Sequence, residues 1–477
     1  MCGIVGYTGS DIAKNILVTG LKRMEYRGYD SSGVALEVGE GAAAHLDVIR
    51  RVGKVAGLES ELSNIDSDAT CGIGHTRWAT HGKPSEANAH PHTSCSGDIA
   101  VVHNGIIENF AELREELEGR GHHFKSETDT EVFAHLIEEA YAETHDLMAS
   151  VREACAHVVG AYGLAAVCAD EPGVIAVARK DSPIVVGAGE TGSYVASDVI
   201  ALIDATRDVV VLEDGQFAKL TPAGVEYTDE AGNVIEPKVT HIDWDLDMAE
   251  KGGYPDFMLK EIHEQPKAVR DTISPRIHEN EIDLGEIGMT DEEIKNLRKI
   301  SIVACGSAYH TGAAGKYVIE ELARIPVETD LASEFRYRNP IYQENSLVII
   351  VSQSGETADS LAALRDAKAH GCKVLSIVNV VGSSIARESD AVLYTWAGPE
   401  ISVATTKAYS CQLAVFYLLA LKFAQIRSAI TPDTFQTLLT ALKQLPDQIE
   451  GLLSQKEKIQ FFANHYLATE HIFFMGR

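Results

Sequence analysis

Residues 347–357 read LVIIVSQSGET, an apolar run that leads directly into a polar turn containing a glycine. The apolar runs Ile300–Ala304 and Val374–Val378 lie before and after it in the sequence. Residues 357–370 have the apolar spacing of a helix and end before Gly371. This repetition of strand, loop and helix predicts a doubly wound, parallel sheet over residues 291–430.

The turn Ser352–Thr357 is suited to binding an anion. It brings three hydroxyl groups and several backbone N–H groups to the start of a helix, where unpaired donors and the helix dipole favour negative charge. It lacks a P-loop lysine, so a single phosphate ester fits it better than a nucleoside triphosphate. The alternative is a hydroxyl-rich helix cap without a ligand. Gly306 and Ser307 follow the preceding strand and are expected at the same sheet edge. Lys407 could contact the ligand there or be a solvated helix residue.

The first 235 residues have a different pattern. Two helical patterns begin near Asn109 and Thr130, the second with Thr128 or Asp129 as its expected cap. Grouped strands with few helices predict a layered α+β domain rather than βαβ units. The β-like runs are Ala100–His103, Leu164–Cys168, Val174–Ala178, Ile184–Val186 and Val209–Leu212.

Two further segments join or follow these parts. Residues 236–290 read as a linker, in which a helix from about Asp256 is expected to stop before Pro266, because the residue before a proline avoids the helical conformation. Residues 431–470 have helical periodicity, and His471–Met475 reads as a strand. The expected segments are therefore 2–235, 236–290, 291–430 and 431–477.

The composition excludes several classes of protein. The chain carries 70 acidic and 41 basic residues, a net charge of -29, which argues against a surface for nucleic acid or anionic membranes. The apolar run Leu413–Leu421 is too short to span a bilayer and predicts a buried helix. None of the eight cysteines forms a C-x-x-C pair, so a zinc ribbon or a redox motif is not expected. The N-terminus lacks a signal-peptide pattern, and together with the cysteine usage this predicts a cytoplasmic protein.

Cys2 is the first candidate for catalysis. Removal of Met1 would leave a cysteine with a free α-amine, whose pKa of about 7.7–8.0 lets it accept the thiol proton near neutral pH. The resulting thiolate could attack an amide carbonyl. The alternative is a small residue that opens a β-strand.

Polar residues elsewhere in this half could complete such a site. Arg77 could pair with a substrate carboxylate through its two-pronged guanidinium, or belong to a structural ion pair. Asn104 and Gly105, at the end of a β-like run, could provide a side-chain amide and a backbone N–H as an oxyanion hole, or form a simple turn. Asp129 could hold a substrate ammonium group.

Six segments of this half carry a family resemblance in their combined order: CGIVGY, EYRGYDSSG, HTRWATHG, NAHPH, HNGIIEN and SETDTE. Together they resemble the N-terminal-nucleophile (Ntn) glutamine amidotransferase domain. The resemblance implies an αββα sandwich of four layers, with Cys2 as the nucleophile and Asn104 with Gly105 as the oxyanion hole. The implied glutamine-site residues are Arg77 on the carboxylate, Asp129 on the amino group, Trp78 as the gate to an ammonia channel, and Thr80, His81 and His90 along the walls.

The second half resembles a sugar isomerase (SIS) domain in the segments CGS, ASEFRYR, SQSGET and VATTK. Joined, the two halves resemble the family of isomerizing glutamine–fructose-6-phosphate aminotransferases over the whole chain. This resemblance implies that glutamine and fructose 6-phosphate become glutamate and glucosamine 6-phosphate, without a metal or organic cofactor, in a protein that forms a homodimer. The implied sugar-phosphate residues are Gly306, Ser307, Ser352, Gln353, Ser354, Thr357 and Val403.

One departure from the family pattern leaves alternatives open. The family has a second SIS domain, which carries the isomerase residues and a Schiff-base lysine, whereas this chain ends one expected strand into it. We expect the chain to be a fragment of a longer protein, and as such it could be a glutaminase that only binds the sugar phosphate. A less favoured alternative is an amidophosphoribosyltransferase, which would need an acidic phosphoribosyl loop. Another is a sugar-phosphate sensor with an inert glutaminase fold, against which Cys2 argues.

Overall fold

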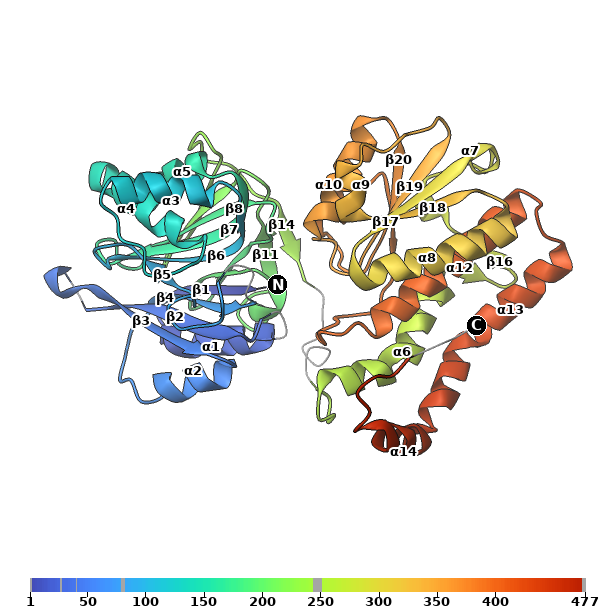
Figure 1. Cartoon of the computed structure of the whole chain (residues 1–477), viewed down its shortest axis with the longest axis horizontal. Helices are drawn as coiled ribbons and strands as arrows, with labels where there is room; N and C mark the ends of the chain where they lie inside the picture. The colour runs from blue at the N-terminus through green and yellow to red at the C-terminus, as the bar shows by residue number, and fades with distance from the viewer. Residues whose placement is uncertain (1, 26–27, 40, 79–81, 243–250, 474–477) are drawn as a thin grey trace. The chain divides into compact units, whose positions relative to one another are not determined.

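The structure of the chain, a computed structural model, describes residues 2–25, 28–39, 41–78, 82–242 and 251–473 (Figure 1). The chain divides into two compact units, Met1–Ala249 and Glu250–Arg477. The first unit is built on antiparallel sheets and the second on a parallel sheet. The change of pattern along the sequence therefore corresponds to a change of architecture.

Two antiparallel sheets form the first unit. In the described part of the chain, their strand orders are β14-β11-β9-β10-β1-β4-β2-β3 and β13-β12-β8-β7-β6-β5. The strands of the first sheet are β1 (Gly3–Gly9), β2 (Ser31–Val38), β3 (His45–Val52), β4 (Cys71–Arg77), β9 (Val185–Gly189), β10 (Gly192–Ala196), β11 (Asp208–Val211) and β14 (Val239–His241). The strands of the second sheet are β5 (His92–Thr93), β6 (Ile99–Ile107), β7 (Gly160–Cys168), β8 (Ile175–Lys180), β12 (Phe217–Thr221) and β13 (Gly224–Thr228). Each of the β-like runs expected from the sequence overlaps one of these strands.

The two sheets pack face to face, and helices cover their outer faces. Ile4 and Ile73 of the first sheet share a buried cluster with Val102 and Val167 of the second. The helices on the first sheet are α1 (Ala13–Met24) and α2 (Val55–Leu62), and those on the second are α3 (Phe110–Gly119), α4 (Glu131–Thr144) and α5 (Leu147–His157) (Figure 1). The αββα sandwich implied by the resemblance is confirmed.

A parallel sheet with the strand order β18-β17-β19-β20-β21 forms the core of the second unit. Its strands are β17 (Lys299–Ala304), β18 (Val327–Leu331), β19 (Ser346–Ser352), β20 (Lys373–Val378) and β21 (Ala391–Tyr394). Successive side chains of a strand point to opposite faces, and in β19 Ile349 and Val351 join one buried cluster while Val348 and Ile350 join another. Because β19 is buried on both faces, it reads as a continuous apolar run.

Helices cover both faces of this sheet, so the doubly wound fold is confirmed. The cluster that contains Ile349 includes residues of α6 (Phe257–Ile273), α8 (Gly306–Ala323), α12 (Lys407–Ile426) and α13 (Pro432–Leu453). The cluster that contains Val348 includes residues of α9 (Ala332–Tyr337), α10 (Ala358–Ala369) and α11 (Ser384–Glu388). By length and composition α12 could cross a membrane, but 61% of its apolar window is buried inside this unit, where it serves as a core helix.

The segment expected as a linker is folded over much of its length. β14 extends the first sheet, and α6 belongs to the second unit. The prediction that this helix ends before Pro266 is wrong, because α6 continues to Ile273 with Pro266 inside it. Val269 and Ile273, which follow the proline, are buried in the core, and their burial offsets the hydrogen bond that proline cannot donate.

The last described residues are helical and then irregular. α13 is followed by α14 (Lys456–Tyr466), which has no buried residue among those the structure describes. Of the strand expected over residues 471–475, residues 471–473 are in no strand, and the remainder lies outside the described residues.

Candidate functional site

Cys2 lies where the pairing of two strands brings it to the end of β4. β1 and β4 are antiparallel, with Gly3 opposite Thr76, so Cys2 lies beside the residues that follow Thr76. A Cβ on Gly3 would come within 2.7 Å of Thr76 Oγ1, so only glycine permits this close approach. The Trp78 backbone N–H donates to Cys2 Sγ over 3.2 Å, and Sγ lies 3.5 Å from the Trp78 carbonyl oxygen. The backbone of Trp78 therefore holds Sγ through both its N–H and its carbonyl group.

Asn104, near the end of β6, points its amide group towards Cys2. Its Nδ2 donates to the Cys2 carbonyl oxygen over 3.2 Å, and its Oδ1 lies 3.0 Å from His75 Nε2. Since Oδ1 can only accept, His75 must carry its proton on Nε2. Burial lowers the pKa of His75 to about 3, so the ring is neutral near pH 7. His75 is thus a positioning residue for the amide, and the sequence reasoning missed it because nothing in the segment HTRWATHG distinguishes a strand histidine from its neighbours.

Gly105 follows Asn104 in a conformation that favours glycine. Its φ is 139°, and a Cβ would lie 2.0 Å from the Ala161 carbonyl oxygen of the neighbouring strand β7. Gly105 itself is exposed. A glycine is therefore required for the backbone N–H to be presented beside the Asn104 amide, as an oxyanion hole needs.

Opposite charges lie close to the nucleophile. Arg77 is buried, and burial lowers the pKa of its guanidinium, while the nearby Cys2, Asp30 and Asp129 act in the opposite direction. Its Nη2 donates to the Gly82 carbonyl oxygen over 3.3 Å. A buried cation near a buried carboxylate suits a substrate that carries both a carboxylate and an ammonium group.

Asp129 does not cap α4 as the sequence predicts, and neither does Thr128. The helix begins after Thr130, and the Thr130 side chain makes no cap hydrogen bond. Asp129 Oδ2 instead accepts from the Ile107 backbone N–H over 2.9 Å, so tertiary contact with β6 replaces the local cap. This contact fixes the carboxylate of Asp129 at the end of β6, the strand that carries Asn104.

His90 lies in a layer of buried histidines beneath these residues. Its ring centroid is 4.0 Å from that of His75 and 4.7 Å from that of His92. Its Nε2 lies 3.0 Å from Thr130 Oγ1, which also lies 2.8 Å from His103 Nδ1. Burial lowers the pKa of all these histidines, so the layer is neutral near pH 7. A contact between His90 and glutamine stays a prediction.

The remaining residues expected at the glutamine site are Trp78, Thr80 and His81. The Trp78 side chain is 39% exposed and packs edge-on against Tyr29, with the ring centroids 5.3 Å apart. Its role as a gate stays a prediction. Thr80 and His81 lie outside the described residues.

In the second unit, the turn after β19 is held by its own hydroxyl groups. Ser352 Oγ accepts from the Gly355 N–H over 3.0 Å and lies 3.1 Å from Thr357 Oγ1. Ser354 Oγ accepts from the Glu356 N–H over 3.2 Å. α10 then begins at Ala358, and the Thr357 side chain does not cap it. The turn is therefore ordered by its own contacts, and the first turn of α10 keeps the character of an anion site.

A loop that follows β20 supports this turn from the side. The Gln353 and Gly355 carbonyl oxygens accept from the backbone N–H groups of Asn379 (3.1 Å) and Ile385 (2.9 Å). Gly355 has a φ of 69°, and a Cβ there would lie 1.9 Å from Ser383 Oγ. The sequence reasoning did not select residues 379–385, although their place after a third parallel strand was a signal for them.

Gly306 and Ser307 open α8 at the same sheet edge. β17 and β19 are parallel neighbours, with Ala304 opposite Val351, so the loops that follow them emerge side by side. β18 lies on one side of β17 and β19 lies on the other, so the direction in which successive strands join the sheet reverses at β17. Doubly wound sheets bind ligands at such a switch point. Gly306 has a φ of 56°, and Ser307 is exposed there.

Comparison with known proteins identifies one domain family in each unit. The glutamine amidotransferase domain family matches residues 54–220, and the SIS domain family matches residues 293–422. Glutamine–fructose-6-phosphate aminotransferase (isomerizing) from Clostridium acetobutylicum is 51% identical over 100% of this chain and 78% of its own length. The enzyme of that name from Symbiobacterium thermophilum is 52% identical, with the same coverage. The chain belongs to this family.

A solved structure of the C-terminal domain of the Francisella tularensis glucosamine-fructose-6-phosphate aminotransferase is also similar. It is 38% identical, covers 48% of this chain and 64% of its own, and has a TM-score of 0.46.

Val403 and Lys407, which the sequence suggested for the sugar-phosphate site, lie around the start of α12. Val403 is 64% exposed in the loop before this helix, and its contact with the sugar phosphate stays a prediction. Lys407 is not the solvated helix residue of one alternative, and the other, a contact with the ligand, stays a prediction. It is buried, and its Nζ lies 2.6 Å from Glu264 Oε2 of α6, so it is a structural ion pair within the second unit.

Proposed function

We propose that the chain takes ammonia from the side-chain amide of glutamine at Cys2 and uses it to convert fructose 6-phosphate into glucosamine 6-phosphate. The observation that carries this proposal is the bonded group around Cys2, in which the Trp78 N–H donates to Sγ and the Asn104 amide, oriented by His75, lies against the same residue. The relatives with this activity in their name match the chain over its whole length.

The glutaminase half-reaction follows from these groups. The Cys2 thiolate attacks the side-chain amide carbon of glutamine, and negative charge develops on the carbonyl oxygen. The Asn104 amide and the Gly105 N–H would stabilise that charge in a site whose neighbouring histidines are neutral. Collapse of the intermediate releases ammonia and leaves a thioester, which water hydrolyses to glutamate. Once Met1 is removed, the free α-amine of Cys2 would accept the proton of the thiol and later donate a proton to the departing ammonia.

Arg77 and Asp129 would orient the substrate. Glutamine carries a carboxylate and an ammonium group on its α-carbon, and the two buried side chains match these charges. Binding both ends of the amino acid fixes the amide carbon relative to Sγ, and such positioning contributes much of the rate enhancement in reactions of this kind.

The sugar phosphate would bind at the switch point of the second unit. Its phosphate group suits the first turn of α10, with Ser352, Ser354 and Thr357 as hydroxyl donors and Gln353 beside them. Gly306 and Ser307 would contact the sugar from the neighbouring loop. The support for this placement is the meeting of the two loops at one sheet edge.

The test is a two-part assay on the 477-residue chain with glutamine that carries heavy nitrogen in its amide. We expect glutamate release, and glucosamine 6-phosphate that contains the heavy nitrogen when fructose 6-phosphate is present. Glutamate without amino sugar would restrict the function of this chain to glutamine hydrolysis with sugar-phosphate binding. The absence of both products from protein with a processed N-terminus would contradict the proposal. A homodimer, a cytoplasmic location and the absence of nucleic-acid or membrane partners stay predictions of the sequence.

A further inference from the structure

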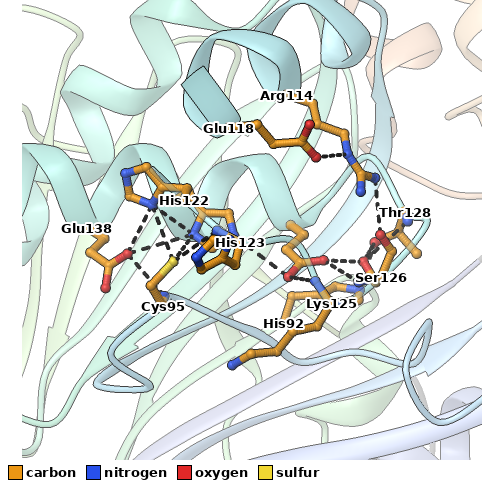
Figure 2. Close-up of polar contacts among 12 residues, drawn as sticks. His92, Cys95, Arg114, Glu118, His122, His123, Lys125, Ser126, Thr128 and Glu138 are labelled. Carbon is orange, nitrogen blue, oxygen red and sulfur yellow. Dashed lines mark hydrogen bonds and ion pairs between the residues drawn. The ribbon is translucent and has the colours of Figure 1, made fainter. Parts of the chain in front are cut away.

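A second cluster of reactive side chains lies in the first unit, among residues that the proposed reaction does not use. It includes Cys95, in the loop between β5 and β6, His122, in the loop between α3 and α4, and Glu138, on α4 (Figure 2). His135, also on α4, completes the cluster. One ligand atom from each residue lies within 4.8 Å of the others. His135 is buried, whereas Cys95 is exposed, so the cluster has a path to solvent.

The distances between these atoms match a tetrahedral metal site. Cys95 Sγ lies 3.5 Å from His122 Nδ1 and 3.6 Å from His135 Nδ1, and the two Nδ1 atoms are 3.2 Å apart. Glu138 Oε2 lies 3.3 Å and 3.7 Å from the same two nitrogens. A tetrahedron built with ordinary zinc bond lengths has S···N edges of about 3.6 Å and N···N or N···O edges of about 3.4 Å.

The far ring nitrogens of both histidines face carboxylates. His122 Nε2 lies 3.1 Å from Glu139 Oε1, and His135 Nε2 lies 3.7 Å from Glu131 Oε1. The Glu139 carboxylate, at hydrogen-bond distance, favours a ring proton of His122 on Nε2, which leaves Nδ1 of that ring as a metal ligand. Histidines that bind metals are oriented by carboxylates in this way.

Backbone donors prepare the other two groups. The Cys95 and Ser96 N–H groups donate to the two oxygens of Glu138, over 3.0 Å and 2.8 Å. The His123 N–H donates to Cys95 Sγ over 3.4 Å and so orients the sulfur. The sulfur of Cys95, the two Nδ1 atoms and the Glu138 carboxylate lie so close together that a cation between them could contact all four.

We propose that Cys95, His122, His135 and Glu138 bind one Zn²⁺ ion in a structural site. A thiolate, two imidazoles and a carboxylate in tetrahedral arrangement are a donor set that zinc prefers over harder cations such as magnesium or calcium. All positions of the tetrahedron are taken by protein atoms, so no position is left for a substrate or an activated water.

The ion would stabilise the segment that carries Asp129. Glu131, beside His135, accepts from the Lys125 and Ser126 backbone N–H groups, each over 2.7 Å. Ser126 Oγ lies 2.9 Å from Thr128 Oγ1, and these contacts continue from the cluster along the loop before α4 (Figure 2). Zinc would therefore fasten three segments of the chain together and hold this loop in place, at a distance from the chemistry itself.

The first experiment measures bound metal. The chain is produced in zinc-supplemented medium, dialysed against metal-free buffer and analysed by elemental mass spectrometry. We expect about one zinc per chain in the unaltered protein and in His123→Ala, a neighbouring histidine outside the cluster. Cys95→Ser and His122→Ala should each weaken zinc binding by about tenfold or more and lose the metal on dialysis. Unaltered protein without zinc, or zinc retained in both cluster variants, would overturn the proposal.

A cobalt experiment shows whether the metal lies at this cluster rather than at Cys2. Co²⁺ added to the metal-free chain should produce the visible bands of tetrahedral cobalt and a near-ultraviolet thiolate charge-transfer band. The charge-transfer band should disappear in Cys95→Ser and remain in Cys2→Ala. The reverse result would place the ion at the nucleophile and overturn the proposal. Zinc should also raise the unfolding temperature of the unaltered chain but not that of Cys95→Ser. Because Cys95 is exposed, a folding defect is a poor explanation for metal loss in this variant.

Discussion

Several side chains of the site in the first unit are buried, whereas the loops of the second unit present mainly hydroxyl and backbone groups. Around Cys2, the amide of Asn104 is oriented by a neutral histidine, and Arg77 is nearly inaccessible to water. Around Ser352, the hydroxyls bond within their own turn, and a glycine with a positive φ lets the backbone pass close to Ser383. Both arrangements place donors where negative charge is expected.

The difference follows from the two kinds of sheet. Neighbouring antiparallel strands let the end of β4 meet the start of β1, so side chains from distant parts of the sequence converge. Parallel strands all end at one edge, and each is followed by a loop and a helix whose N-terminus provides donors. The first site should therefore respond to side-chain substitution and to pH, and the second to changes of backbone conformation.

The largest effect is expected from Cys2→Ala. Loss of the nucleophile should lower glutamine hydrolysis by at least about 10⁴-fold, because no other group can form the thioester. The measurement is glutamate release under saturating glutamine. Binding of fructose 6-phosphate, measured by calorimetry, should be unchanged. Hydrolysis that persists in this variant would refute the assignment of the nucleophile.

Asn104→Ala should have the next largest effect. Removing a donor to the developing oxyanion lowers kcat by about 10²–10³-fold. KM for glutamine should change little, because the donor acts mainly in the transition state. The matched control is Asn233→Ala, an exposed turn residue of the same unit, which should leave both constants unchanged. An equal loss in kcat and gain in KM would argue instead for a general disturbance of the site.

Gly355→Ala should break the second site without affecting the first. The added Cβ would lie 1.9 Å from Ser383 Oγ, so the turn must move, and we expect sugar-phosphate affinity to fall by about 100-fold. The control is Gly371→Ala, which has a similar φ of 76° but no atom within 4 Å of the new Cβ. Gly371→Ala should lower the free energy of unfolding as Gly355→Ala does, but it should leave the sugar-phosphate affinity unchanged. Similar binding losses in both variants would show that strain alone, rather than the shape of the turn, is responsible.

The smallest effect is a pH dependence of stability confined to the first unit. Burial lowers the pKa of His75 and of His92 from 6.5 to about 3 in the folded chain. Between these values the unfolded state binds protons that the folded state does not, so stability falls as the pH drops below 6.5. At pH 5.5 each histidine should cost about 1.4 kcal/mol relative to pH 7.5 or above.

This dependence can be followed by hydrogen exchange, which separates the two units. His92→Gln should remove about half of the loss that the two histidines cause, and His45→Ala, whose side chain is exposed, should leave it unchanged. A loss of the same size in amides of β17 and β19 would contradict the assignment to the buried histidines.

Local patterns predicted a layered α+β first domain and a doubly wound second one, whereas the four layers of the first came from the family resemblance. Short β-like runs and continuous apolar runs identified strands such as β6 and β19, and the polar turn at Ser352–Thr357 indicated an anion site before any contact was known. The rule that a helix ends before a proline failed at Pro266, because the residues of α6 that follow this proline are buried in the core. Local preference was outweighed there by tertiary packing.

Short-range periodicity and the identity of each side chain were sufficient to predict most strands and helices and the residue types that carry chemistry. Which of these residues meet depends on the tertiary fold. The orientation of Asn104 by His75 joins positions in two different sheets, and the cluster of Cys95, His122, His135 and Glu138 joins two loops and a helix. Such convergence depends on strand register and helix packing, which no spacing along the chain reveals.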